Sequence, residues 1–442
     1  MVHRGCRPHR NEGLTTTVKW YQDGTLHFGL GIEDTFVPQT RAGERALDEY
    51  ELTEHYENWH GDLQLASDVG AQFIRWGIPW HRVNPAPGEW DWEWVDRVLG
   101  RFDELGIRPI IDLLHYGTPL WMQSEFAHPD FARHFADYAV ACAERYRDRV
   151  TDYTPVNEPM IHARFSGDVA YWPPYLSGER GYNTIALALA EGFVRAQRGI
   201  AEVLGERATF VHVDATARFA GDVDGQHRPL VALQRAQSFL VEDLVTGGVD
   251  ERHDMLGSLR ASGVTDDTLA WFASHAVKPD VMGVNYYPRH STQLMEEGIV
   301  HAGGFVDPWP TQDDGVAGLE ELLRTYAHRY GAPVMLTETC VTASVEERIA
   351  WLDASVASVR GLREGGLDVV GYTWWPLFDM YEWTYRHADT PRSESLLTMG
   401  LFDLVESSQG LLRRKNPVAD RFRQVATDAA ANAPISRTGA AR

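Results

Sequence analysis

The stretch VTDYTPVNEP, residues 150–159, joins a short run of β-branched and aromatic residues to an Asn, a Glu and a Pro. The run VTDYTPVN is typical of a buried strand, and Asn157 and Glu158 come at its end. A carboxylate in this position is costly to remove from water unless something there uses it. We therefore expect Glu158 to have a function and a partner elsewhere in the chain.

Similar runs recur along the sequence, and amphipathic segments with helical spacing separate most of them. The candidate strands are residues 27–33, 72–78, 108–114, 150–157, 208–214, 279–287, 332–338 and 369–375. The clearest candidate helices are residues 58–70, 92–106, 131–149, 182–205 and 344–366. Eight such alternations without a linker predict an α/β fold, a single (β/α)8 TIM barrel. No nucleotide-binding Gly motif follows the first strand, which argues against a doubly wound sheet.

The barrel is expected to span residues 19–425 as one catalytic domain. Residues 1–18 carry several basic groups but no apolar segment of the kind found in secretory signals. Residues 426–442 are rich in Ala and small polar residues. We predict both segments to be disordered tails, and no apolar run is long enough to predict a membrane span.

Composition narrows the choice of partner. The chain has 442 residues, 44% of them hydrophobic, and a formal net charge of -22. This charge would repel a phosphate backbone or an anionic membrane, so we expect a small-molecule partner and neither nucleic acid nor membrane. The three cysteines, Cys6, Cys142 and Cys340, are too widely spaced for a disulfide framework or a metal site. They indicate a reducing, cytoplasmic location, and the sequence carries no signal for the oligomeric state.

In a (β/α)8 barrel the functional site forms at the carboxyl ends of the strands. Polar or aromatic residues end most of the predicted strands, namely Arg75, His115, Asn157, Glu158, Asn285, Tyr287, Glu338 and Trp375. Glu158 and Glu338 end the fourth and seventh strands and would face each other across the barrel mouth. A lone Glu there is often a cap or a salt-bridge residue, but an opposed pair is what cleavage of a glycosidic bond requires.

The chain resembles glycoside hydrolase family 1, the retaining β-glycosidases, as a divergent member. The similar segments occur in the family's order and extend over nearly the whole chain. They are RWGIPWHR (75–82), LHYGTP (114–119), NEP (157–159), GVNYY (283–287), TE (337–338) and GYTWWPLFDMYEW (371–383).

The resemblance implies an exo-acting, β-glucosidase-like enzyme that hydrolyses O-glycosidic bonds of a small glycoside or short oligosaccharide without metal or cofactor. Glu338 matches the family's nucleophile and Glu158 its acid/base, and in retaining enzymes these carboxyls lie roughly 5 to 5.5 Å apart. Arg75 and Tyr287 match residues that orient the nucleophile. Arg75 is expected to favour the ionised form of Glu338 and to leave the proton on Glu158.

The resemblance also implies a set of sugar-binding residues. Trp375 matches the aromatic floor beneath the sugar ring, and Asn157 matches the residue that binds the 2-hydroxyl. Taken alone, Trp375 and Trp383 would be assigned to core packing, and their spacing around Glu382 is what favours a role in binding. The full set is His115, Asn157, Asn285, Trp375, Glu382, Trp383 and Gln39.

The first strand departs from the family pattern. The position of a Gln that the family uses falls at Pro38 or Gln39. Glu33 and Asp34 place two acids where the family has small residues. These acids either read a further sugar hydroxyl or form a structural pair.

Other departures leave the specificity open. Gly117 replaces an Asp of the family motif, and Thr339 and Cys340 follow Glu338 in place of Asn and Gly. We expect Cys340 to be a loop or core residue, because no base accompanies it. Residues 386–400 are expected to be an insertion relative to the family, which forms a lid, a specificity loop or a plain solvated loop. The alternatives are a glycosidase or transglycosylase of shifted specificity, for galacto, fuco or unusual glycosides, and a sugar-binding pseudoenzyme.

Overall fold

Eight parallel strands close into a barrel. The computed structural model describes residues 18–215, 218–221, 225, 228–295 and 310–431. The barrel strands are β1 (His27–Gly31), β4 (Phe73–Gly77), β5 (Arg108–Asp112), β6 (Asp152–Thr154), β7 (Thr209–Ala215), β9 (Val281–Asn285), β11 (Val334–Glu338) and β12 (Val369–Trp374). They follow one another round the barrel in chain order, and β12 pairs with β1. Each strand lies within or overlaps one of the eight predicted runs, so the predicted (β/α)8 fold is confirmed.

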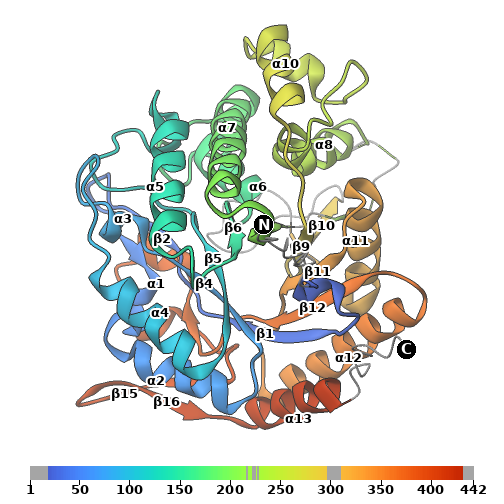
Figure 1. Cartoon of the computed structure of the whole chain (residues 1–442). Coiled ribbons are helices and arrows are strands. Elements are labelled where there is room, and N and C mark those ends of the chain that lie inside the picture. The colour runs from blue at the N-terminus through green and yellow to red at the C-terminus, as the bar shows by residue number, and fades with distance from the viewer. Residues whose placement is uncertain (1–17, 216–217, 222–224, 226–227, 296–309, 432–442) are drawn as a thin grey trace, which may run out of the picture.

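Helices surround the barrel (Figure 1). They are α1 (Glu49–Leu52), α2 (His55–Asp68), α3 (Trp80–Val83), α4 (Glu93–Leu105), α5 (Phe131–Arg145), α6 (Pro159–Ala163), α7 (Gly178–Leu204), α8 (Arg228–Val245), α9 (Leu256–Ala261), α10 (Asp266–His275), α11 (Gly315–Tyr330), α12 (Val345–Glu364) and α13 (Pro417–Ala431). The ends of several follow local chemistry. Ser344 and Glu347 form a capping box at the start of α12. Gly106, in the left-handed conformation, ends α4.

Shorter strands and helical turns occur outside the eight barrel strands. The additional strands are β2 (Phe36–Val37), β3 (Leu47–Asp48), β8 (Arg218–Gly221), β10 (Thr292–Met295), β13 (Met380–Tyr381), β14 (Leu396–Leu397), β15 (Phe402–Ser407) and β16 (Gly410–Lys415). The short helical turns are η1 (Trp20–Gln22), η2 (Glu125–Ala127), η3 (Arg164–Asp168), η4 (Gly205–Arg207), η5 (Trp383–His387) and η6 (Arg392–Ser395).

The interior of the barrel is apolar towards the amino ends of its strands. Side chains from β4, β5, β7, β9, β11 and β12 form a small buried cluster there, and η1 contributes Trp20 and Tyr21 to it. The cluster consists of Trp20, Tyr21, Phe73, Ile110, Val211, Val213, Val281, Met335 and Val370. Trp20 also donates a hydrogen bond to Asp152 at 2.6 Å. The opposite end of the barrel is thereby the end left for polar chemistry.

The predicted tails lie largely outside the described residues. The last helix, α13, continues to Ala431, and Ala426 is buried. The boundary that we predicted after residue 425 therefore falls inside a helix. Among the residues described, no helix is both long and apolar enough to cross a membrane.

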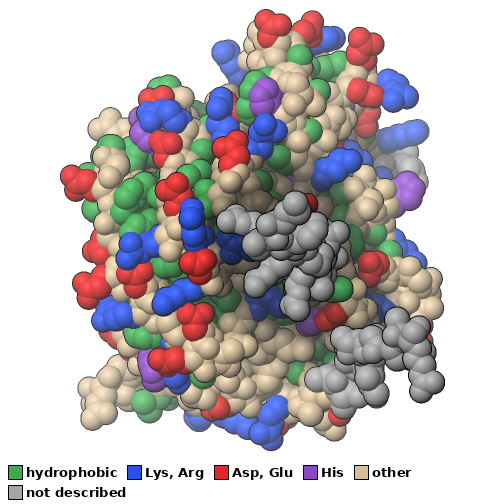
Figure 2. Space-filling view, in the orientation of Figure 1, with side chains coloured by type: hydrophobic (Ala, Val, Ile, Leu, Met, Phe, Trp, Pro, Cys, Tyr) green, Lys and Arg blue, Asp and Glu red, His purple; other side chains and the backbone are tan. Residues whose placement is uncertain are grey.

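Charged side chains of both signs are interspersed over the visible face of the molecule (Figure 2). The described part of this face therefore presents no continuous basic surface of the kind that binds a phosphate backbone.

Candidate active site

The two glutamates of the predicted pair lie at the carboxyl ends of their strands. Glu338 is the last residue of β11, and Glu158 follows β6 at the start of α6. Only 6% of Glu158 and 4% of Glu338 is exposed. Glu158 has a positive φ of 44°, which is unusual for a residue with a side chain. Backbone strain of this kind persists where the surrounding structure enforces it, and such sites are often functional.

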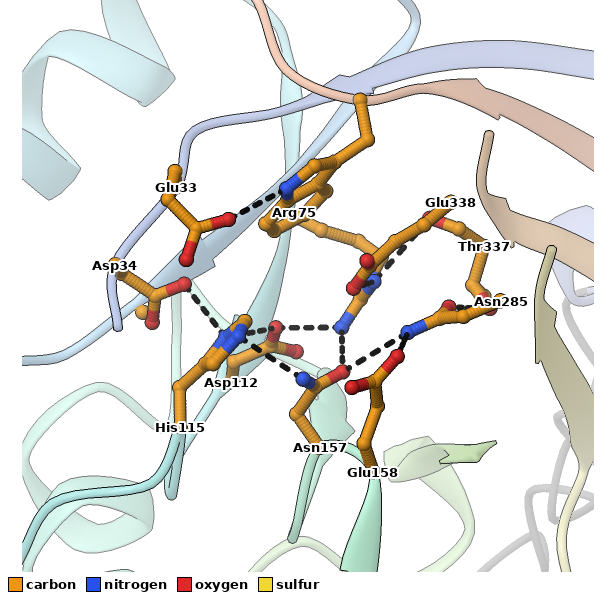
Figure 3. Close-up of polar contacts among 12 residues, drawn as sticks. Glu33, Asp34, Arg75, Asp112, His115, Asn157, Glu158, Asn285, Thr337 and Glu338 are labelled. Atoms are coloured by element: carbon orange, nitrogen blue, oxygen red, sulfur yellow. Dashed lines mark hydrogen bonds and ion pairs between the residues drawn. The ribbon is translucent and has the colours of Figure 1, made fainter. Parts of the chain in front are cut away.

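Arg75, in β4, is the central cation of the site (Figure 3). Its side chain is completely buried. One terminal nitrogen donates to Oε1 of Glu338 at 2.7 Å, and the other donates to Oδ2 of Asp112 at 2.6 Å and to Oδ1 of Asn157 at 2.7 Å. A single guanidinium therefore holds two carboxylates and one amide.

The direction of these bonds fixes the neighbouring side chains. A guanidinium can only donate, so Oδ1 of Asn157 must face Arg75 and its Nδ2 must face the other way. That Nδ2 lies 3.0 Å from Nε2 of His115. Nε2 is then the acceptor, and the hydrogen of His115 sits on Nδ1, which lies 2.7 Å from Oδ1 of Asp34.

Glu158 is held through both of its oxygens. Asn285, the last residue of β9, donates to Oε1 at 2.7 Å. The hydroxyl of Thr337 donates to Oδ1 of Asn285 at 2.7 Å and so keeps the amide in place. Tyr116 donates to Oε2 of Glu158. Hydrogen bonds through Asn285, Asn157 and Arg75 link Glu158 to Glu338, and Figure 3 shows the two acids on opposite sides of these linking residues.

Trp375 follows β12 and is fixed by Glu33. Its indole Nε1 donates to Oε2 of Glu33 at 2.7 Å. The ring passes over Gly31 of β1 so closely that a Cβ there would lie 1.7 Å from it. The site therefore requires Gly31, and His115 stacks beside the indole with ring centroids 5.9 Å apart.

Burial disfavours charge on both glutamates. It raises the pKa of Glu158, although hydrogen bonds from Tyr116 and Asn285 oppose the increase. It also raises the pKa of Glu338 to about 8, where the charge of Glu158 adds to the effect and Arg75 opposes it. The pair consequently retains a proton near neutral pH. The expected ionised state of Glu338 thus depends on its contacts with Arg75 and Tyr287, because burial acts against it.

The predicted site residues divide into two groups. Arg75, His115, Asn157, Asn285 and Trp375 join the two glutamates in one buried network. Tyr287 also belongs to it, because its hydroxyl donates to Oε2 of Glu338 at 2.7 Å. Trp383 is half-buried and lies beside Tyr116, with ring centroids 5.2 Å apart.

Glu382 and Gln39 lie outside this buried network. Both side chains are exposed. The other candidate for the position of Gln39, Pro38, is buried but has no polar side-chain atom. Glu33 and Asp34 instead supply the polar groups that the first strand contributes. Both acids contact side chains of the chain itself: Glu33 contacts Trp375, and Asp34 contacts His115. This favours the interpretation of Glu33 and Asp34 as structural residues.

Sequence reasoning missed two members of the network, Asp112 and Tyr116. Asp112 is a fully buried acid within the predicted apolar strand 108–114. A carboxylate inside such a strand was the only sequence signal that this residue has a polar partner. Tyr116 follows His115 in the LHYGTP segment, and its contact with Glu158 depends on how the loop folds.

Two remaining expectations concern the loops. Cys340 is buried, and burial raises the pKa of its thiol well above the usual value, so it is the core residue that we expected. The insertion 386–400 is more than a solvated loop. The completely buried Arg386 donates to the backbone oxygens of Val37, Pro38 and Arg45 and to Glu44, and so ties the insertion to the first loop of the barrel mouth.

Two groups among the described residues have donor atoms close enough to hold a metal ion. Asp34, Asp112 and His115 form the buried one, but Arg75 already occupies Asp112, and Asp34 and His115 are in direct contact. The second group, His128, Asp130 and His134, lies at the surface, with Arg133 against the ring of His134. Neither arrangement favours a bound cation over the contacts already present.

The arrangement contains groups that can act as an acid and as a nucleophile. It has two buried carboxyl groups that together retain a proton, a fixed cation beside one of them, and an amide and an imidazole next to that cation. A retaining glycosidase requires such a pair. The separation of roughly 5 to 5.5 Å between the carboxyl groups stays a prediction.

Comparison with known proteins agrees with this geometry. A family model described as glycosyl hydrolase family 1 matches residues 19–389. The chain is 28% identical over 382 residues to a bifunctional β-D-glucosidase/β-D-fucosidase of Bifidobacterium breve, covering 75% of this chain and 81% of that protein. It is 24% identical over 493 residues to a β-galactosidase of Saccharolobus solfataricus, covering 96% and 91%. A family 1 β-glucosidase from Thermotoga maritima, solved with isofagomine lactam, has the same fold, with a TM-score of 0.75 at 19% identity and coverage of 92% and 98%.

Proposed function

The chain belongs to glycosyl hydrolase family 1, and we propose that it is a retaining, exo-acting β-glycosidase with β-glucosidase-like specificity. Its substrate is a small glycoside or a short oligosaccharide. The relatives named above act on β-glucosides, β-fucosides or β-galactosides according to their names, which supports a sugar of this class.

The reaction proceeds by double displacement. The carboxylate of Glu338 attacks the anomeric carbon while Glu158 gives its proton to the departing oxygen, and a glycosyl ester forms on Glu338. Water then attacks the anomeric carbon, and Glu158 removes its proton. Arg75 and Tyr287 orient the two oxygens of Glu338. Asn157 binds the 2-hydroxyl, where hydrogen bonds strengthen in the transition state.

The remaining predicted sugar-binding residues recognise the sugar. Trp375 supplies an apolar face for the ring, and His115 and Asn285 present polar atoms at its edge. Glu382, Trp383 and Gln39 lie towards the outside, where they meet the hydroxyl groups farthest from the anomeric carbon.

One observation carries the proposal: Arg75 joins Glu338 directly, and Glu158 through Asn157 and Asn285, in one buried network. A binding protein would have no use for two buried carboxyl groups that repel each other.

Two substitutions test the roles with an aryl β-glucoside. Glu338→Gly should lose nearly all turnover. Glu158→Ala should lose turnover of substrates with poor leaving groups and should regain activity in azide, with a β-glycosyl azide as product. Wild-type rates in both variants would contradict the assignment. A wild type that binds the glycoside and releases no phenol would instead support a sugar-binding pseudoenzyme.

A second candidate is a glycosidase or transglycosylase of shifted specificity. The residues that follow β1 favour it. Buried Glu33 and Asp34 replace small residues, and Gln39 is exposed. A panel of aryl β-glucosides, galactosides and fucosides separates the candidates. The sugar with the highest kcat/KM decides the specificity, and the ratio of transfer product to free sugar decides between transfer and hydrolysis.

A further inference from the structure

Tyr116 is a contact of the proposed acid/base, and no role has yet been assigned to it. Its hydroxyl meets Oε2 of Glu158, and its side chain is only 3% exposed. A phenolic hydroxyl can both donate and accept a hydrogen bond, so Tyr116 can interact with Glu158 whether or not that acid carries a proton.

The surrounding structure forces Tyr116 into this position. Its φ is 74°, a left-handed conformation that a Tyr rarely adopts. Four aromatic rings enclose it, with ring centroids between 4.6 and 5.2 Å from its own. The enclosing residues are His115, His162, Trp172 and Trp383. A strained and enclosed residue of this kind has little freedom to move its hydroxyl away from Glu158.

The next residue explains how the loop reaches this conformation. A Cβ on Gly117 would lie 2.2 Å from the ring of Phe36 and 2.5 Å from its backbone oxygen. Phe36 also donates its backbone N–H to the carbonyl of His115 at 3.3 Å. The departure from the family motif at Gly117 therefore allows the loop to pack beneath Phe36, with Tyr116 facing Glu158.

The direction of the hydrogen bonds decides which oxygen of Glu158 carries the proton. Arg75 turns Oδ1 of Asn157 towards itself, and Nδ2 of Asn285 lies 3.5 Å from that oxygen and donates to Oε1 of Glu158. Oε1 is thus occupied as an acceptor. A proton on Glu158 must then sit on Oε2, the oxygen that Tyr116 contacts.

We propose, on the basis of the glycosidase function above, that Tyr116 is a positioning residue that holds Oε2 of Glu158 and stabilises the carboxylate formed when the proton leaves. The proton on Oε2 passes to the glycosidic oxygen as the bond between that oxygen and the anomeric carbon breaks and Glu338 bonds to that carbon. Tyr116 then donates to the new carboxylate and keeps its own proton. Burial raises the pKa of its phenol well above 10, in agreement with this role.

Several other charged or titratable groups act on Glu158 and must stay constant in any test. Arg75 favours its ionised form, as does His115 when its imidazole is protonated, and Glu338 disfavours it. The hydroxyl of Tyr287 and the buried acid Asp214, at the end of β7, also interact with its charge. A substitution at Tyr116 that removes only the hydroxyl leaves all of them in place.

The first experiment measures pH profiles of kcat/KM for Tyr116→Phe, with Tyr153→Phe as the matched control. Tyr153 is a fully buried residue of β6, and its hydroxyl has no hydrogen-bond partner among the described residues. With a substrate of poor leaving group, the alkaline limb should move up by about one pH unit in Tyr116→Phe, because a charge-assisted hydrogen bond is lost. The limb of Tyr153→Phe should match the wild type.

Leaving groups distinguish this role from a structural one. A 2,4-dinitrophenyl glycoside departs without a proton, so Tyr116→Phe should cleave it within about twofold of the wild type. Equal losses on good and poor leaving groups, or an unmoved limb, would overturn the proposal.

A second measurement needs no turnover. The Glu338→Gln variant is labelled with carbon-13 at its Glu carboxyl groups, and NMR at increasing pH gives the pKa of Glu158. The signal of Glu158 is the one that disappears when Glu158→Gln is added. Adding Tyr116→Phe should raise this pKa by about one unit. An unchanged value would refute the role of Tyr116. An inactive wild type, together with a shifted pKa, would refute the glycosidase assignment alone.

Discussion

Replacing Glu338 with Gln should stabilise the folded protein at alkaline pH. Burial and the neighbouring charge of Glu158 raise the pKa of this carboxyl to about 8 in the folded chain, where the two acids share one proton, whereas an unfolded Glu titrates near 4.3. A group with a raised folded pKa binds its proton more tightly in the native state. Its contribution to stability is therefore fully present below about pH 4 and is lost as the pH rises through about 8.

The size of the effect follows from the shift. Each pKa unit corresponds to about 1.4 kcal/mol. Between about pH 5 and about pH 8 the wild type should lose on the order of 3 kcal/mol of unfolding free energy through this carboxyl, and Gln should not. The amide oxygen of Gln can still accept the hydrogen bond from Arg75, and Asp112 still balances the guanidinium charge.

Urea unfolding followed by tryptophan fluorescence measures this difference. Glu338→Gln should approach the wild type near pH 5 and exceed it near pH 8. Glu364→Gln, at an exposed position of α12, should follow the wild type throughout. Parallel curves for the wild type and Glu338→Gln would refute the reasoning, because they would show that the buried carboxyl is no harder to ionise than an unfolded one.

Three further substitutions address the neighbours. Asp112→Asn leaves Glu338 as the only carboxylate bound to Arg75, so the acidic limb of kcat/KM should move down by about one pH unit. An upward shift would contradict the competition for Arg75. Glu33→Ala removes the hydrogen-bond acceptor of the Trp375 indole and should raise KM about tenfold. Glu33→Gln keeps an acceptor, so its KM should stay near that of the wild type. Equal KM values for the two variants would contradict a positioning role of Glu33. Arg386→Met should lower the unfolding free energy by about 3 kcal/mol in urea, and a loss below about 1 kcal/mol would contradict a buried clamp.

The fold could be predicted because its signals are local. Each barrel strand is a short apolar run, and each run was visible without knowledge of its neighbours. The closure of the barrel then follows from the alternation, and it brings residues as distant as Glu158 and Glu338 to one rim. The end of the chain was harder, because the Ala-rich composition of α13 suits both a helix and a tail.

The contacts within the site could be predicted only in part. Residues at strand ends, such as Arg75 and Asn285, were found because the barrel fixes where a strand ends. Asp112 and Tyr116 were missed because side-chain direction depends on register and on loop conformation. Gln39 was carried over from a family position, but in this chain Glu33 and Asp34 supply the buried polar groups next to β1.

The central claim is that Glu338 forms a covalent bond to the sugar. A 2-deoxy-2-fluoro β-glucoside with a dinitrophenolate leaving group slows the second step and lets the intermediate accumulate, so peptide mass mapping can locate the label. We predict one fluoroglucosyl group per chain on the peptide containing Glu338, with release of one equivalent of dinitrophenolate. A label on another residue, or turnover of an aryl glucoside with inversion at the anomeric carbon, would contradict the account.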